Sequence, residues 1–388
     1  MFNKLSLMLT TLKFTNTGRS QFFPTVRKRV DAYFKENNLS PNANGAMWAK
    51  VTFFMTGYAL LYGLILSNQF SNLTMLGLAM LLGMFAAFIG FNVSHDAMHG
   101  SLSARGWVNE LFSNSFYLLG ASPYVWKITH NIVHHTYTNI PGHDEDIEVA
   151  PGLIRLDPDE AWRPWQRYQQ WYAFPVYCLA SLSWVLRKDY LKFFKDKIGQ
   201  TQNSGHPRRE YITLFATKFA YYIFFLALPY YMLDITLGQL LLGFVIMHAV
   251  EGLVLGLVFQ LAHVVEGTAF PVPSERGTIE EAWAIHQVRT TANFAPRSWL
   301  ASFLCGGLNR QIEHHLFPKV CHIHYPAVAA IVRETAHEFG LPYIENPTFS
   351  SALLSHFKTL QAMGRPALAD VSVSPIRVGQ LQESASVL

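Results

Sequence analysis

The sequence predicts an all-α integral membrane protein, with four transmembrane helices in two hairpins and a cytoplasmic helical cap. Two observations carry this prediction: the length of the apolar segments and the one-sided distribution of the basic residues. The chain of 388 residues is 50% apolar and only 14% charged. Because soluble domains carry about 25% charged residues, so low a share indicates that part of the surface faces lipid.

Four segments are long and apolar enough to cross a bilayer, which takes about 20 helical residues. They cover residues 49–67, 73–93, 212–233 and 237–262. Only a few residues join the first span to the second and the third to the fourth, so each pair is expected to turn back as a hairpin. A further apolar run, 171–186, is short and contains Pro175. We expect an interfacial helix there rather than a fifth span.

Lys and Arg residues indicate the side of the membrane on which each loop lies. Of the 30 basic residues, 29 lie in residues 1–50, 94–211 and 263–388, and neither short turn carries one. By the positive-inside rule these three segments, with both termini, are cytoplasmic. The remaining basic residue, Lys218, lies inside the third span, where it either snorkels to the surface or faces a polar interior.

The chain divides into an N-terminal cytoplasmic segment (1–47), a membrane domain (48–345) and a C-terminal tail (346–388). In the first segment, Phe22 to Glu36 has the pattern of an amphipathic helix. That helix either packs on the rest of the protein or lies on the membrane surface. The end of the tail, from Pro366, is rich in small and polar residues and is expected to be poorly ordered.

Polar and small residues interrupt the fourth span. Gly252 and Gly256 form a GxxxG pair, which typically lets another helix approach closely. His248 and Glu251 lie in the same span, where polar groups usually face the interior of the helix bundle. These two side chains either satisfy each other or lie near a bound substrate.

Histidines gather in three groups, all in segments placed on the cytoplasmic side. The groups are His95 and His99, then His130, His134 and His135, then His314 and His315; His263 follows the fourth span on the same side. A spacing of four residues puts two imidazoles on one face of a helix. A lone pair of this kind is more often a surface feature, but three groups on one side of the membrane predict metal binding.

The number of imidazoles limits the kind of metal site. Imidazole suits zinc, copper, iron and nickel, and a single zinc ion takes only three or four protein ligands. Seven or eight histidines therefore suit two ions with about four ligands each. The soluble carboxylate di-iron plan needs two Glu-x-x-His pairs, of which only Glu334 with His337 occurs. Zinc-protease HExxH motifs and CxxC pairs are absent from the sequence.

Metal-bound imidazoles usually donate their second N–H to a carboxylate or a carbonyl group. The carboxylates close to the histidine groups in sequence are Asp96, Asp144, Glu145, Asp146 and Glu313. We single out Asp96 and Asp146, together with Gln311, as candidates for such supporting contacts. His322 and His324 are expected to support the site rather than to bind metal, and the role of His286 stays open.

At these residues the chain resembles the membrane fatty acid desaturases. Their three histidine boxes correspond here to HDAMH (95–99), HNIVHH (130–135) and QIEHH (311–315), and the resemblance covers about residues 20–345. It implies a non-haem di-iron centre and no catalytic residue separate from the metal ligands. The ligands that it implies are His95, His99, His130, His134, His135, His263, His314 and His315.

Gln311 stands where many desaturases have the first histidine of the third box. The resemblance then implies a front-end enzyme of Δ5 or Δ6 type, similar to linoleoyl-CoA desaturases. Such an enzyme uses O₂ to insert a cis double bond into an acyl-CoA or acyl-lipid.

Residues 1–47 contain no histidine and are too short for a fused cytochrome b5 domain. Electrons are therefore expected from a separate ferredoxin or cytochrome b5 with its reductase, which basic residues such as Lys127 would help to dock. The box contexts point to a bacterial inner membrane.

Two other functions stay open. A sphingolipid desaturase or a fatty acyl hydroxylase could use the same scaffold, because a few residues beside the metal decide the outcome. A non-enzymatic membrane metal-binding protein is a more distant alternative. Transporters place their ligands at mid-membrane, whereas these histidines are predicted at its edge. Nothing in the sequence indicates a nucleic-acid partner.

Overall fold

The computed structural model describes residues 12–16, 18–147, 149–157 and 160–366, and within them it is mostly helical. Four helical segments are long and apolar enough to cross a membrane. They are α2 (Gly45–Leu66), α3 (Asn72–Ile89) continued by η1 (Gly90–Ser94) and α4 (His95–Met98), α11 (Arg208–Tyr222) continued by η6 (Ile223–Ala227) and α12 (Leu228–Met232), and α13 (Leu237–His263). The four predicted spans are thus confirmed as apolar helices of membrane-crossing length.

Polar caps start three of these helices. Asn44 and Ser71 each accept a hydrogen bond from a backbone N–H of the first turn of α2 and α3, respectively, and Thr236 forms a capping box with Gln239 at the start of α13. Such caps satisfy N–H groups that have no partner inside the helix. In the most apolar 18-residue stretch of each helix, only 22% is buried within the protein for α2 and 17% for Arg208–Met232. Helices this apolar and this exposed suit a lipid surrounding.

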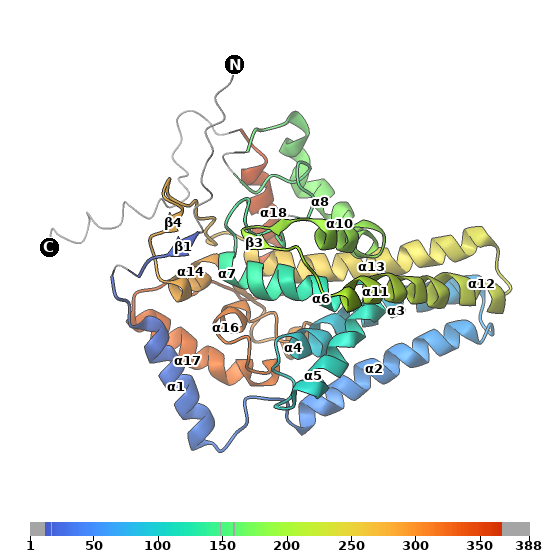
Figure 1. Cartoon of the computed structure of the whole chain (residues 1–388), viewed down its shortest axis with the longest axis horizontal. Helices are drawn as coiled ribbons and strands as arrows, with labels where there is room; N and C mark the ends of the chain where they lie inside the picture. Colours follow the sequence, from blue (N-terminus) through green and yellow to red (C-terminus); the bar gives the residue numbers. More distant parts are fainter. Residues whose placement is uncertain (1–11, 17, 148, 158–159, 367–388) are drawn as a thin grey trace.

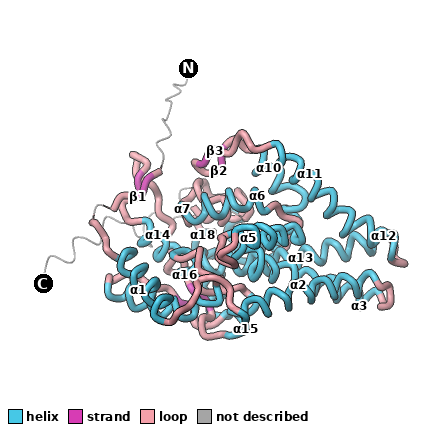
Figure 2. The backbone as a smooth tube through the Cα atoms, turned by 60° about the horizontal axis from the view of Figure 1, so that its bottom comes forward, coloured by secondary structure: helices cyan, strands magenta, loops and turns pink. Residues whose placement is uncertain are grey.

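The spans extend towards one end of the molecule, and shorter helices gather at the other (Figure 1). Helix α3 packs against both α2 and α13. The gathered helices include α1 (Phe22–Glu36), α14 (Trp283–Thr290), α16 (Gln311–Leu316) and α17 (Tyr325–Glu338). Figure 2 shows the same division from another side. Three pairs of two-residue strands tie loops together: β1 (Lys13–Phe14) with β4 (Thr278–Ile279), β2 (Lys197–Ile198) with β3 (Thr201–Gln202), and β5 (Asn293–Phe294) with β6 (Glu345–Asn346).

The amphipathic helix α1 packs on the protein itself. Its apolar residues Phe22, Val26, Val30 and Phe34 are buried against α14, α16 and α17. Its Arg29 lies 2.8 Å from the carboxylate of Glu338 at the end of α17. Of the two positions that the sequence left open for this helix, the structure therefore has the packed one.

The C-terminal part contains a further helix, α18 (Phe349–Met363), which packs against α8 (Gln169–Tyr177) and α13. Residues 349–363, which the sequence assigned to a tail, thus lie against the membrane domain. The stretch from Pro366 that was expected to be poorly ordered falls almost wholly on residues 367–388, outside the described part of the chain.

The apolar run around Pro175 folds into short consecutive helices and is not one of the four membrane-length segments among the described residues. It comprises η4 (Pro164–Tyr168), α8, α9 (Ala180–Ser183), η5 (Trp184–Lys188) and α10 (Asp189–Phe194). Ser181 of α9 lies 2.7 Å from Nδ1 of His248. Because a helix rises about 1.5 Å per residue, His248 lies about 22 Å from His263 at the end of α13. The run therefore reaches far along α13.

Lys218 and His248, two polar residues of the spans, find hydrogen-bond partners inside the bundle. Lys218 lies 2.7 Å from the carboxylate of Asp189, so it faces a polar interior rather than snorkelling. His248 contacts Ser181 through Nδ1 and the hydroxyl of Tyr221, 3.1 Å away, through Nε2. Glu251 lies 3.5 Å from the same Nδ1. The two polar residues of the fourth span are therefore neighbours, but His248 bonds chiefly to other helices.

The GxxxG pair of α13 forms the close contact that its spacing predicts, and the partner is α8. A methyl group on Gly252 would lie 2.7 Å from the carbonyl oxygen of Tyr177, and one on Gly256 would lie 2.8 Å from the Cβ of Tyr177. Gly243, in the same helix, has no atom within 4 Å of such a methyl group. Only the first two positions therefore require glycine for packing.

We expect Gly252→Val to destabilise the protein by about 1–3 kcal/mol, the usual cost of overpacking, because the backbone of α8 cannot give way as a flexible side chain would. Thermal unfolding of the detergent-purified protein should show a lowered midpoint for this variant and an unchanged one for Gly243→Val. Equal midpoints for the two variants would contradict the packing described.

Candidate metal centre

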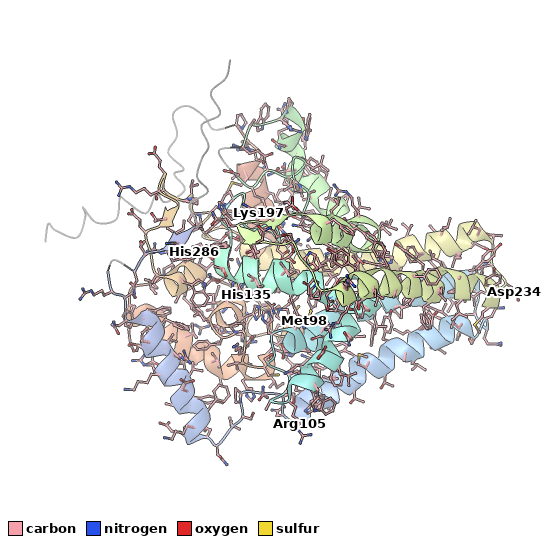
Figure 3. The ribbon with its side chains drawn as sticks, in the orientation of Figure 1. Met98, Arg105, His135, Lys197, Asp234 and His286 are labelled. Atoms are coloured by element: carbon pink, nitrogen blue, oxygen red, sulfur yellow. The ribbon has the colours of Figure 1, made fainter. Side chains whose placement is uncertain are left out.

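The structure brings all eight predicted histidines together where α4 and α13 meet the shorter helices. His95 begins α4, His99 follows it and His263 ends α13. His130 and His134 lie in the π-helical segment η3 (Lys127–His134), His135 begins α7 (His135–Tyr137), and His314 and His315 lie in α16. Figure 3 places His135 and Met98 at this junction and Asp234 at the opposite end of the spans.

Ring nitrogens form two clusters with a histidine between them. Ligand atoms of His95, His99, His130 and His314 all lie within 4.8 Å of one another, and so do those of His134, His263 and His315. We call these the first and the second cluster. His135 lies between them, because it groups with His314 and His315 and its Nε2 is 3.0 Å from Nε2 of His314.

The second and third histidine boxes each serve both clusters. His130 belongs to the first cluster and His134 to the second, although the two rings stack at 4.9 Å. His314 and His315 divide in the same way. The two histidines of HxxxH in the second box therefore belong to different clusters, whereas both histidines of the first box belong to the first cluster.

Burial favours the neutral form of five of these imidazoles, whereas the pKa of His134 is raised because the neighbouring Asp144 outweighs desolvation. Desolvation, followed by the neighbouring imidazoles, lowers the pKa of each of five histidines well below its usual range; these are His99, His130, His135, His314 and His315. A neutral imidazole keeps the lone pair that a metal ligand needs. The centre is thus chemically suited to cations.

Several ring nitrogens in the centre lack any hydrogen-bond partner among the described residues although they are buried. They are Nε2 of His95, His99 and His134 and Nδ1 of His135. Leaving buried polar atoms unpaired is costly, so four such atoms in one place indicate that something binds there. Metal ions fit this requirement.

The opposite edges of the rings are held by other side chains. Nδ1 of His134 lies 2.8 Å from Asp144, and Nδ1 of His130 lies 3.2 Å from Asp146. Nδ1 of His314 lies 3.1 Å from the hydroxyl of Tyr325, and Nδ1 of His315 lies 2.7 Å from Oε1 of Gln287. These contacts turn the Nε2 atoms of the rings towards the centre.

The predicted supporting residues differ in what they contact. Asp146 contacts His130 as expected. Asp96 lies 3.9 Å from Nδ1 of His95 but only 2.9 Å from Nδ1 of His322. Nε2 of His322 in turn lies 3.0 Å from the ammonium of Lys50. Both nitrogens of His322 are thus in contact with other side chains.

Gln311 lies among the nitrogens of the second cluster. Its Nε2 is 3.0 Å from Nε2 of His263 and 3.2 Å from Nε2 of His315. Turning the amide by 180° would bring its oxygen to the same place, so Gln311 can face a cation directly. His286, in contrast, is buried against Glu281 and Phe14 and belongs to none of the clusters.

Several supporting residues could not be singled out from the sequence. Asp144 was one of five carboxylates near the boxes, and its preference for His134 depends on how residues 138–146 fold back. Gln287 and Tyr325 come from α14 and α17, and no local pattern links them to the boxes. For Thr138 and Asn139, the only signal in the sequence is their position directly after the second box.

We expect Asp144→Asn to weaken metal binding by about 10–100-fold, as loss of a partner to a metal-bound imidazole generally does. The adjacent Glu145 pairs with Lys192 and Lys195 and contacts none of the clustered histidines, so Glu145→Gln should bind metal like the unaltered protein. Competitive titration with a chromogenic chelator measures both affinities. Equal affinities would show that Asp144 does not support the metal ligand.

Comparison with known proteins gives a consistent family. The family model described as fatty acid desaturase matches residues 71–347. The sn-1 linoleoyl-lipid 6-desaturase of Synechocystis sp. is 35% identical over 92% of this chain and 99% of its own length. The acyl-lipid (8-3)-desaturase of Physcomitrium patens is 36% identical over 91% of this chain and 74% of its own length.

A further relative is the sn-1 linoleoyl-lipid 6-desaturase of Arthrospira platensis, 35% identical over 91% of this chain and 95% of its own length. The resemblance drawn from the three histidine boxes is thereby confirmed, and with it the expectation of a desaturase. The matched region contains all eight clustered histidines. The chain therefore belongs to the fatty acid desaturase family.

Proposed function

We propose that this desaturase binds two iron ions in its eight-histidine centre and inserts a cis double bond into the acyl chain of a membrane lipid, on the carboxyl side of an existing double bond. One observation carries the proposal: eight histidines from distant parts of the chain converge with buried, unpaired ring nitrogens. Their division into two clusters supports two ions rather than one.

The donor set suits iron. Each cluster offers imidazole nitrogens, which are good ligands for that metal. His135 between the clusters and Gln311 beside the second one complete the set. Two bound iron ions would supply the O₂ chemistry by which two adjacent CH₂ groups each lose a hydrogen atom. Overall, one O₂ combines with these two hydrogen atoms, two electrons from the donor protein and two protons from solvent. The products are two water molecules and the double bond.

The protein holds the ligands in place and keeps water from them. The indole of Trp126 stacks on His130 at 4.1 Å and also contacts the rings of His95 and His99. Phe259 of α13 makes an edge-on contact with the ring of His130 at 5.9 Å. These apolar walls exclude competing solvent, and an acyl chain that enters along them meets the centre in a dry surrounding.

A lipid-linked substrate is supported by the names of the relatives, which act on acyl-lipids and linoleoyl-lipids. The exposed apolar helices also place the protein in the bilayer, where such substrates lie. The same names support insertion by a front-end enzyme of Δ5 or Δ6 type. Gln311, which stands in place of the first histidine of the third box, also supports a front-end enzyme.

The cytoplasmic side is supported by charge. The short connections 67–71 and 233–236 carry no Lys or Arg, and the histidine centre lies at the opposite end of the spans (Figure 3). By the positive-inside rule the two hairpins then open towards the cytoplasm, where the shorter helices cap them. We place the enzyme in a bacterial inner membrane, with electrons from a separate ferredoxin or cytochrome b5 and its reductase.

The fatty-acid profile of a desaturase-deficient host fed linoleate tests the function. Gas chromatography–mass spectrometry should show a new double bond on the carboxyl side with the unaltered protein and none with His314→Ala. The exposed His337, outside both clusters, supplies the matched control, and His337→Ala should behave like the unaltered protein.

Unchanged lipids in a host where the protein is iron-loaded and supplied with a reductase would refute acyl desaturation. Hydroxylated or sphingoid products would refute it in favour of a hydroxylase or a sphingolipid desaturase on the same scaffold.

A further inference from the structure

We infer that Thr138 and Asn139 are positioning residues for the second cluster alone, so that altering them costs the protein one of its two metal ions. The inference rests on the proposed two-metal function and goes beyond it, because it assigns each metal its own support. Both residues directly follow the second histidine box and are fully buried. Neither belongs to the histidine clusters.

The amide of Asn139 joins three chain segments at the second cluster. Its Nδ2 lies 2.9 Å from the carbonyl oxygen of His263, 3.2 Å from that of Ala269 and 3.1 Å from that of Thr290. Three carbonyl oxygens around one nitrogen define its orientation, since only the NH₂ group can donate to them. The carbonyl oxygen of Thr290 also lies 3.4 Å from Nδ1 of His263. Asn139 thus holds His263 through its backbone and, by way of Thr290, through its ring.

The backbone of Asn139 reaches a second histidine. Its N–H donates to Oδ2 of Asp144 over 2.9 Å, and the same oxygen lies 2.8 Å from Nδ1 of His134. This geometry needs a φ of +57° at Asn139, a left-handed conformation that asparagine adopts more readily than most residues. The amide and the unusual backbone therefore act together on His134 and His263.

Thr138 supplies the contact to the third member of the cluster. Its hydroxyl lies 2.9 Å from Oε1 of Gln287 and 3.3 Å from Nδ1 of His315. The same amide oxygen lies 2.7 Å from that Nδ1. The carbonyl oxygen of His134, 2.6 Å from the hydroxyl, is the alternative acceptor for its single proton. Two consecutive residues therefore support all three histidines of the second cluster.

The first cluster has different supports. His130 is held by Asp146 and His314 by Tyr325. Among the hydrogen bonds of the described residues, those of the Thr138 and Asn139 side chains reach no ring of the first cluster. Loss of either side chain should therefore leave the first metal in place and loosen the second.

Asn139→Gly separates the two contributions of that residue. Glycine adopts the left-handed backbone freely, so the bond to Asp144 is kept and only the amide is lost. Thr138→Val removes the hydroxyl at nearly constant volume, and Thr138→Ser restores it. Asn203 supplies the matched control, because it is also buried and its Nδ2 also contacts two carbonyl oxygens, those of Lys192 and Lys195, outside the centre.

The test is metal content per chain, by inductively coupled plasma mass spectrometry, on full-length protein purified in detergent and equilibrated at a series of buffered free Fe(II) concentrations up to saturation. Chelator titration measures the affinity of each ion, and thermal unfolding checks the fold. We expect two ions in the unaltered protein, in Asn203→Ala and in Thr138→Ser. Asn139→Gly and Thr138→Val should keep one ion at normal affinity and bind the other about 10–100-fold more weakly.

Two tightly bound ions in both Asn139→Gly and Thr138→Val, or equal weakening of both ions, would overturn the assignment of these residues to one cluster. Fewer than two ions in the unaltered protein would instead overturn the two-metal function itself, so the two failures are distinguishable. Thr138→Val also keeps the test decisive if Asn139→Gly does not fold.

Discussion

The gathering of eight imidazoles in one place, seven of them buried and His99 half-buried, is the constraint on which the rest of the structure depends. Unpaired ring nitrogens in a buried interior are costly, so the rings must be fixed from behind and turned towards bound metal. Asp144, Asp146, Tyr325 and Gln287 provide this fixation. The cap of short helices is needed because these side chains come from segments that only a folded cap brings together.

The membrane helices and the cap meet at this centre and stabilise each other there. His95 and His263 stand at the ends of two spans, His99 directly follows the first of these, and the other histidines come from η3, α7 and α16. The approach to the first box contains the π-helical segment η1, and the second box lies in the π-helical segment η3. Such segments recur at functional sites. Here η3 allows neighbouring rings of one box to serve two clusters.

Much of this arrangement could be predicted from the sequence, because its signals are local. Apolar length identifies the four spans, and the three boxes identify the histidines. The partition of His130 and His134 between clusters could not be predicted, because a regular spacing of four suggests a shared metal. The depth to which residues 164–194 follow α13, and the supports from Gln287 and Tyr325, depend on tertiary packing that leaves no periodic trace in the sequence.

We expect the metal to be held by histidines from both clusters. X-ray absorption at the iron edge of the loaded, purified protein tests it most directly. The structure predicts a first shell dominated by imidazole nitrogen, visible through multiple scattering from the outer ring atoms, with a second iron nearby. A shell dominated by carboxylate oxygen or by sulfur, or a spectrum without imidazole scattering, would contradict the account.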